Sequence, residues 1–93
     1  MPEEARLCAV AKITNKRGLH ARASAKLVEA AVRFQAHVTV SKDGQTVDAR
    51  SIMGLMLLAA SLGSTVEICA EGEDAQAALT AILALIEAKF GEE

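Results

Sequence analysis

The sequence predicts an α+β fold: an open-faced β-sandwich in which a four-stranded antiparallel sheet carries three helices on one face. Segments with alternating apolar residues, typical of strands, are interleaved with segments of helical periodicity in the order β-α-β-β-α-β-α. Hydrophobic residues make up 52% of the 93 residues, but aromatic residues only 2%. Aliphatic side chains must therefore form the core of one domain spanning residues 1–93.

The first half of the chain contains a strand, a helix and a hairpin. The strand is predicted from the alternation of Leu7, Ala9, Ala11 and Ile13. A helix of about three turns should follow His20, because apolar residues recur there at helical spacing. Two further strands are joined at Asp43-Gly44, a dipeptide that suits the positive backbone angles of a tight hairpin. The predicted inner stripe of the helix is Ala23, Leu27, Val28, Ala31 and Phe34.

The second half adds a short helix, a strand and a long helix. Ser51 is suited to cap a helix that runs to about Leu62 and ends at Gly63. Alternation between residues 66 and 71 predicts the fourth strand. Asp74 can cap the last helix. The predicted inner stripe of that helix is Ala75, Leu79, Ile82, Ile86 and Phe90.

The short middle helix carries more apolar residues than one buried face requires. One stripe, predicted to seat the helix on the sheet, consists of Leu55, Leu58, Ala59 and Leu62. A second set lies mostly on the other side and consists of Ile52, Met53, Met56, Leu57 and Ala60. A domain this small cannot bury all sides of a short helix. We therefore expect Ile52, Met53, Met56 and Leu57 to form a docking patch, the alternative being a deeply buried helix.

The charge distribution argues against some partners and favours others. The net charge of −2 and the absence of Trp and Tyr argue against nucleic acid as a partner. Between residues 5 and 28, however, there are six cations and no acidic residue. Such a positive segment attracts anions, although an ordinary solvated surface would look the same.

Cys8 and Cys69 are too few and too far apart in sequence for a disulfide framework or a zinc site, so we expect plain packing residues with reduced thiols. There is no histidine or cysteine pair at metal-ligand spacing, so we expect neither metal nor cofactor. The sequence has no signal peptide and no apolar run of membrane-spanning length. We therefore expect a cytoplasmic protein without membrane insertion.

The stretch "NKRGLHARASAKL" places His20 at the start of the first helix. The free N–H groups and the dipole at that end favour an anion. Arg22 offers a planar set of donors to a phosphate, and Lys16 and Arg17 add positive charge. Gly18 allows the backbone to bend sharply or to approach a ligand closely.

A neutral imidazole in this position is a competent nucleophile, and the surrounding donors would stabilise an anion that it captured. On local chemistry alone, His20 could equally be a loop residue that caps the helix. No carboxylate lies nearby in sequence to form a triad, although a distant one could fold against the ring.

Two motifs together resemble a known family. "GLHARASA" and, about thirty residues later, "ARSIMGLM" are similar to the histidine-containing phosphocarrier protein HPr of the phosphoenolpyruvate-dependent sugar phosphotransferase system. The resemblance extends from Leu7 to about Lys89. It implies that His20 accepts a phosphoryl group on Nδ1 from phosphorylated enzyme I and passes it to IIA domains of sugar permeases. Arg22 corresponds to the active-site arginine of the family.

The resemblance also implies a carrier rather than an enzyme, acting as a monomer and docking its partners through the middle helix. It places Ser51 where many HPr proteins are phosphorylated by HPr kinase/phosphorylase, although a simple helix cap needs only the hydroxyl group. Ala23 departs from the family, which usually has proline there. The start of the helix should therefore be slightly less rigid.

Two other functions are compatible with the sequence. One is a carrier of the nitrogen-related branch of the same system. The other is a non-catalytic regulatory module, in which phosphorylation of Ser51 controls binding to a transcription factor or an enzyme. The "GLHAR" motif argues against the second, because a purely regulatory protein would not need His20.

Overall fold

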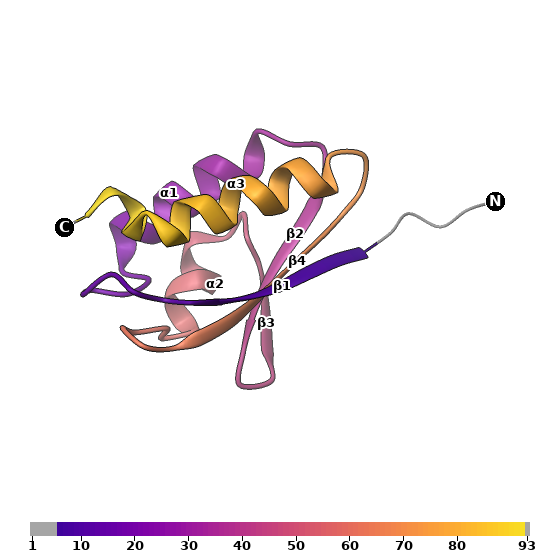
Figure 1. The fold of residues 1–93 in the computed structure, drawn as a ribbon. Coiled ribbons are helices and arrows are strands. Elements are labelled where there is room, and N and C mark those ends of the chain that lie inside the picture. The colour runs from indigo at the N-terminus through magenta and orange to yellow at the C-terminus, as the bar shows by residue number, and fades with distance from the viewer. Residues whose placement is uncertain (1–5, 93) are drawn as a thin grey trace.

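The structure, a computed structural model, describes residues 6–92. The strands form one antiparallel sheet in the order β1-β4-β2-β3, and the helices pack on one side of it (Figure 1). The predicted α+β open-faced sandwich is confirmed. In chain order, the elements are β1 (Arg6–Lys12), α1 (Ala21–Val32), β2 (His37–Lys42), β3 (Gln45–Asp48), α2 (Ile52–Leu57), β4 (Thr65–Glu71), α3 (Ala75–Glu87) and the 3-10 turn η1 (Lys89–Gly91).

The core lies between the sheet and the helices. On the central strand β4, Val66 and Ile68 are buried beneath the helices, whereas Glu67 is exposed on the opposite face. Helices α1 and α3 lie side by side above this layer (Figure 1). The predicted inner stripe of the last helix is buried in full. Among residues 6–92, no helix has both the length and the apolar character that crossing a bilayer requires.

Helix α2 is shorter than the sequence predicts. It ends at Leu57, and Ala59 then adopts a φ of 54°, which is incompatible with a continuing helix. The chain turns here because the Ala60 carbonyl accepts a hydrogen bond from the Leu19 N–H at 2.9 Å. As a result Ala60 is buried, and the predicted inward positions Ala59 and Leu62 are exposed.

Two local expectations at loops have different outcomes. The hairpin turn is confirmed, since Asp43 and Gly44 have φ values of 51° and 84°. The prediction that Asp74 caps the last helix is wrong. Its side chain makes no cap hydrogen bond, and its Oδ2 accepts instead from the Gln35 N–H at 2.7 Å. Asp74 therefore joins the β4–α3 turn to the segment after α1.

The expectation that Cys8 and Cys69 are unlinked packing residues is wrong. They form a disulfide across strands β1 and β4. The two residues stand directly opposite each other in the antiparallel register, with their Cα atoms 4.1 Å apart. This closeness is typical of the pairs at which opposing side chains approach most. The pairing brings together residues 61 positions apart in sequence.

The end of the chain returns to the start of α1. Phe90 has a φ of 56° and is fully buried, which turns the backbone sharply after α3. The Lys26 ammonium donates a hydrogen bond to the Phe90 carbonyl oxygen at 2.6 Å. This turn places Glu92 beside the loop that precedes α1.

Truncating Phe90 should weaken the whole fold. Phe90→Ala removes a fully buried side chain and leaves a cavity, so the free energy of unfolding should fall by about 3–5 kcal/mol. Urea unfolding followed by circular dichroism measures this loss. Val32→Ala, at an exposed position of α1, is the control and should change stability by no more than about 0.5 kcal/mol. Equal losses in the two variants would contradict the assignment of Phe90 to the core.

Candidate functional site

The loop that carries His20 is held against the segment after α2. Gly18 adopts a φ of 62°, and a Cβ atom at this position would overlap the carbonyl oxygen of Ala60. Glycine is therefore required here, because the backbone bends with a positive φ, as one of the two predicted alternatives has it, and approaches the backbone of Ala60 closely. The hydrogen bond from the Leu19 N–H to the same carbonyl oxygen fastens the loop there.

His20 is the N-terminal cap of α1. Its Nδ1 accepts a hydrogen bond from the Arg22 N–H at 3.3 Å. The Ser24 N–H donates to the His20 carbonyl oxygen at 2.8 Å, and the buried Ser24 hydroxyl donates to the Leu19 carbonyl oxygen at 3.1 Å. The first turn of α1 thus orients both the backbone and the ring of His20.

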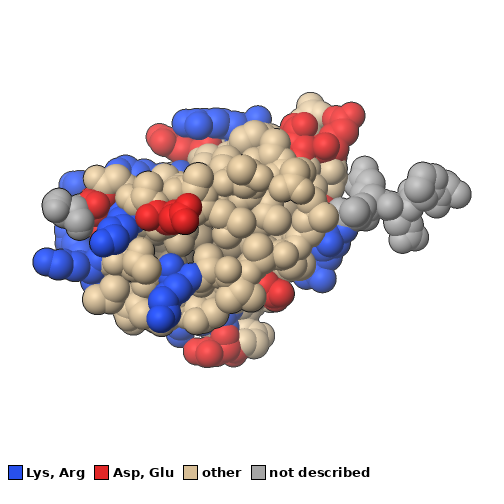
Figure 2. All heavy atoms as spheres, viewed as in Figure 1, with Lys and Arg blue, Asp and Glu red and all other residues tan. Residues whose placement is uncertain are grey.

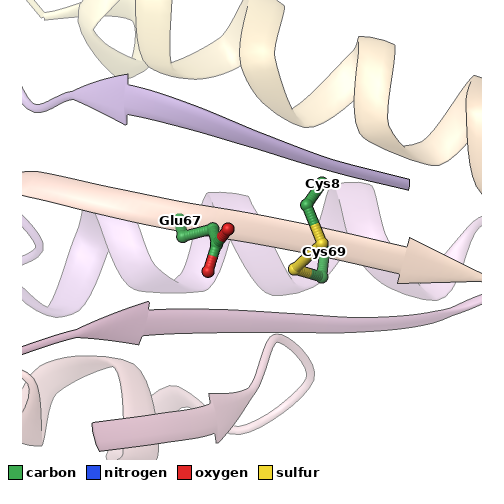
Figure 3. Close-up of side chains that lie close together, drawn as sticks. All are labelled: Cys8, Glu67 and Cys69. Carbon is green, nitrogen blue, oxygen red and sulfur yellow. A yellow bond between two sulfur atoms is a disulfide. The ribbon is translucent and has the colours of Figure 1, made fainter. Parts of the chain in front are cut away.

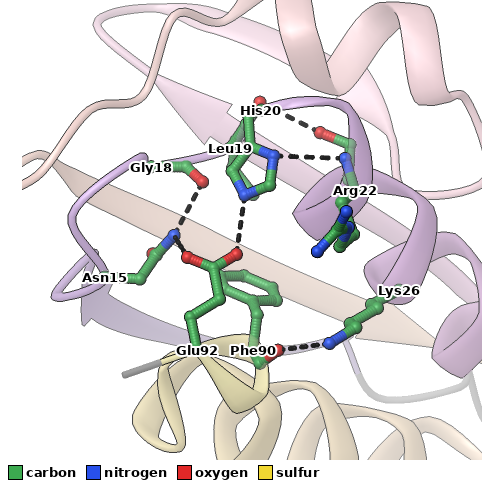
Figure 4. A network of polar contacts seen from close by, with 9 residues as sticks. Asn15, Gly18, Leu19, His20, Arg22, Lys26, Phe90 and Glu92 are labelled. Carbon is green, nitrogen blue, oxygen red and sulfur yellow. Dashed lines mark hydrogen bonds and ion pairs between the residues drawn. The ribbon is translucent and has the colours of Figure 1, made fainter.

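The other ring nitrogen faces a carboxylate from the far end of the chain. The Nε2 atom of His20 lies 2.6 Å from Glu92 Oε2 (Figure 4). The second oxygen of Glu92 accepts from the side-chain amide of Asn15 at 3.2 Å. The same Asn15 nitrogen donates to the Gly18 carbonyl oxygen at 2.8 Å, so the buried Asn15 connects the loop to the C-terminal turn.

These contacts determine which nitrogen of a neutral His20 ring is free to react. An ionised carboxylate can only accept, so the hydrogen bond to Glu92 requires the proton to be on Nε2. The lone pair then resides on Nδ1, consistent with the hydrogen bond that Nδ1 accepts from Arg22. The nucleophilic atom of this tautomer is therefore Nδ1, at the N-terminal end of α1.

The electrostatics of the contact favour the ionised form of Glu92. The hydrogen bond from His20 lowers the pKa of Glu92 below its usual value. Partial removal from solvent opposes this effect, whereas the hydrogen bond from Asn15 and the positive charge of Arg17 reinforce it. Glu92 is therefore ionised at neutral pH and can act as the acceptor for His20.

Positive side chains surround the ring. Lys16, Arg17 and Arg22 line one hollow together with His20 and Glu92. Figure 2 shows that Lys and Arg side chains gather at the end of the molecule where the C-terminal turn meets the start of α1. The structure thus brings Arg17 and Arg22 together with His20, as the sequence predicted. The arrangement can hold an anion beside Nδ1.

The second set of predicted residues lies on α2. The Ser51 hydroxyl accepts a hydrogen bond from the Gly54 N–H at 2.9 Å, so the predicted N-cap is confirmed. Ile52, Met53, Met56 and Leu57 are all exposed, and we call them the α2 patch. Leu55, on the opposite side of the helix, is fully buried. The α2 patch is an exposed apolar surface on an element that packs against α1.

Comparison with known proteins identifies the family. A family model described as the PTS HPr component phosphorylation site matches residues 8–88. The chain belongs to the HPr family. Among its relatives, the phosphocarrier protein HPr of Cupriavidus necator is 56% identical over 80 residues, which cover 86% of this chain and 90% of the relative. The phosphocarrier protein NPr of Shewanella violacea is 45% identical over 80 residues, or 86% of this chain and 88% of the relative.

The fold comparison agrees with this identification. The crystal structure of HPr-C-His from Thermoanaerobacter tengcongensis matches with a TM-score of 0.90 and 46% sequence identity, covering 94% of this chain and 98% of that chain. An HPr protein carries phosphoryl groups within the phosphotransferase system and is not itself a catalyst. In this family, a side chain of the protein itself carries the phosphoryl group.

Sequence reasoning missed two residues of the HPr site, Asn15 and Glu92. Glu92 lies 72 positions from His20, and nothing in the local pattern indicates that the C-terminal turn folds back to the ring. Asn15 was part of the singled-out stretch, but its burial and its two hydrogen bonds depend on that same turn. The sequence allows a distant carboxylate to fold against the ring, but it does not indicate which one.

Acidification should detach Glu92 from His20. Because the pKa of Glu92 is lowered in the folded protein, its contacts contribute stability above the ordinary carboxyl pKa. That stability is lost as the pH falls through the lowered pKa. NMR titration of the Glu92 carboxyl carbon measures the effect. In His20→Ala the pKa of Glu92 should rise toward its ordinary value, and an unchanged titration curve would refute the contact.

Proposed function

We propose that this protein is a phosphocarrier in which His20 Nδ1 accepts a phosphoryl group from phosphorylated enzyme I and passes it to IIA domains. The observation that supports the proposal most directly is the hydrogen bond between His20 Nε2 and Glu92, because it places the proton on Nε2 and leaves Nδ1 unprotonated. Membership of the HPr family supports the choice of partners.

The transfer moves the phosphoryl group from the donor to His20. His20 Nδ1 attacks phosphorus, the bond between phosphorus and the donor residue of enzyme I breaks, and that donor residue leaves with the electron pair. The Arg22 N–H, which donates to Nδ1 in the free carrier, is then placed to donate to a phosphoryl oxygen. The guanidinium groups of Arg17 and Arg22 offset the charge of the phosphoryl group, and Glu92 stabilises the proton on Nε2.

The α2 patch serves as the docking surface for both donor and acceptor. Its apolar side chains are exposed, and the α2–β4 connection holds the loop that carries His20. Met53 and Met56 have flexible, polarisable side chains that adapt to different partner surfaces. A shallow interface of this kind permits the rapid release that a carrier requires.

Ser51 is proposed as a regulatory phosphorylation site for an HPr kinase/phosphorylase. Its hydroxyl group caps α2 directly before Ile52, so a phosphate would introduce negative charge at the border of the α2 patch. Desolvating that charge during docking would weaken partner binding. Phosphorylation of Ser51 would therefore slow transfer through His20.

The cellular setting belongs to the same proposal. The protein would act as a monomer in the cytoplasm, binding neither nucleic acid nor membrane, and without metal or cofactor. Service in the nitrogen-related branch is a second candidate, favoured by the similarity to a phosphocarrier protein NPr. Transfer assays with acceptor proteins of each branch separate the two.

Replacing His20 should abolish phosphoryl acceptance. Wild-type protein mixed with labelled phosphoenolpyruvate and enzyme I should acquire one acid-labile phosphoryl group, whereas His20→Ala should acquire none, because Nδ1 is gone. Ser51→Ala is the control and should be labelled like the wild type. Label retained by a folded His20→Ala protein would place the acceptor elsewhere.

A charge in the α2 patch should slow transfer without unfolding the protein. Met53 is 68% exposed, so Met53→Glu should change stability by about 0.5 kcal/mol or less while raising the KM of enzyme I for this carrier about tenfold or more. Val10→Glu, at a position 66% exposed on β1, is the matched control and should leave KM unchanged. Equal effects of the two variants would exclude α2 as the docking surface.

A further inference from the structure

The Cys8–Cys69 disulfide lies on the face of the sheet opposite the helices of residues 6–92. Figure 3 shows both cysteines and Glu67 on neighbouring strands, with the side chains close together. Cys8 is exposed on the edge strand β1, whereas Cys69 is only 3% exposed on β4. Of the two cysteines, Cys8 is therefore the one on the solvent side of the pair.

We propose that Cys8 and Cys69 form a reversible dithiol–disulfide site that exchanges with glutathione-type small disulfides. The Cys8 thiolate attacks one sulfur of the small disulfide and expels one thiolate, giving a mixed disulfide. The Cys69 thiolate then attacks the Cys8 sulfur, forms the protein disulfide and releases the second small thiolate. Two protein thiols are oxidised, one small disulfide is reduced to two thiols, and the protons pass to the released thiolates.

The geometry favours formation of the internal Cys8–Cys69 disulfide over a lasting mixed disulfide with glutathione. Cys8 and Cys69 are register partners, so strand pairing holds the second thiol beside the first before any bond forms. The resolving step is therefore intramolecular and benefits from a high effective concentration. Exposure selects Cys8 as the attacking residue, and proximity selects Cys69 as the resolving one.

The sheet does not depend on the disulfide, which makes the site reversible. Strands β1 and β4 are in register at seven residue pairs, from Arg6↔Glu71 to Lys12↔Thr65, and only one of these pairs is the disulfide. The inner residues of both strands pack under the helices through contacts that do not involve either sulfur atom. Reduction therefore leaves a folded protein with two adjacent thiols.

Glu67 moderates the reactivity of this site. Its carboxylate and both sulfur atoms lie within 4.8 Å of one another. The residues opposite it are uncharged, Val10 on β1 and Ser41 on β2, whereas Glu71 stands opposite Arg6. The remaining charged or titratable groups on this face of the described sheet are Lys12 on β1, His37 on β2 and Asp48 on β3, whose carboxylate lies 3.6 Å from His37 Nε2. The negative charge of Glu67 disfavours the thiolate form and repels anionic glutathione, so it slows exchange.

Redox titration of the full-length protein tests the site. Reduced protein is equilibrated with glutathione at increasing ratios of disulfide to thiol, quenched with acid, alkylated and weighed by mass spectrometry. The expected result is one transition in which both thiols disappear together in a monomer. The single variant Cys69→Ser should instead accumulate a glutathione adduct on Cys8, and Cys8→Ser should react more slowly because Cys69 is buried.

Three outcomes would overturn the proposal. The protein could stay reduced at every ratio, it could stay oxidised until a denaturant unfolds it, or it could form disulfide-linked dimers instead of the internal bond. None of these readouts involves His20, so they leave the proposed carrier function untouched. Thermal unfolding of both redox forms checks that the reduced protein remains folded.

The effect of Glu67 is tested by the kinetics of oxidation. Glu67→Gln should speed oxidation by glutathione disulfide about two- to fivefold at neutral pH, as expected for removing one charge about 5 Å from a thiol near the surface. Glu71→Gln, whose charge faces Arg6, is the matched control and should change the rate less. An unchanged or slower rate in Glu67→Gln would refute the role of Glu67.

Discussion

The contact between His20 Nε2 and Glu92 Oε2 is the constraint on which the site depends. It ties the N-terminal end of α1 to the C-terminal turn and leaves the lone pair of the imidazole on Nδ1. Phe90, which is buried and turns the backbone after α3, leads the chain to this contact. Packing in the core thus contributes to the choice of the nitrogen that carries the proton. The contact at the His20 ring and the burial of Phe90 belong to the same C-terminal turn.

Most of the fold could be predicted from the sequence because its signals are local. Alternating strands, the helical stripe of α3 and the Asp43-Gly44 turn each depend on residues within a few positions of one another. The misassigned details depend on distant partners. Helix α2 ends early because the Ala60 carbonyl is bound by Leu19, and Asp74 is drawn away from its cap by Gln35. Neither Leu19 nor Gln35 can be recognised as the partner from the sequence of a single segment.

The residues of the candidate site also differ in whether local sequence could reveal them. His20, Arg17, Gly18 and Arg22 lie within six consecutive positions, so one stretch of sequence was enough to find them. Glu92 lies 72 positions away from His20, and Cys8 lies 61 positions away from its partner. The register between β1 and β4 decides that the cysteines meet, and a shift of one residue would point them to opposite faces. Pairings of this kind follow only from the assembled fold.

The disulfide also gives the molecule an unusual covalent topology. When it is closed, the backbone from Cys8 to Cys69 becomes a ring that includes α1, α2 and the two strands between them, and α3 with the C-terminal turn forms a tail. A protease that cuts once inside the ring leaves a single connected molecule. A cut in the tail, by contrast, breaks the covalent link between Glu92 and the ring that holds His20. A single cut therefore has different covalent consequences for His20 and for Glu92.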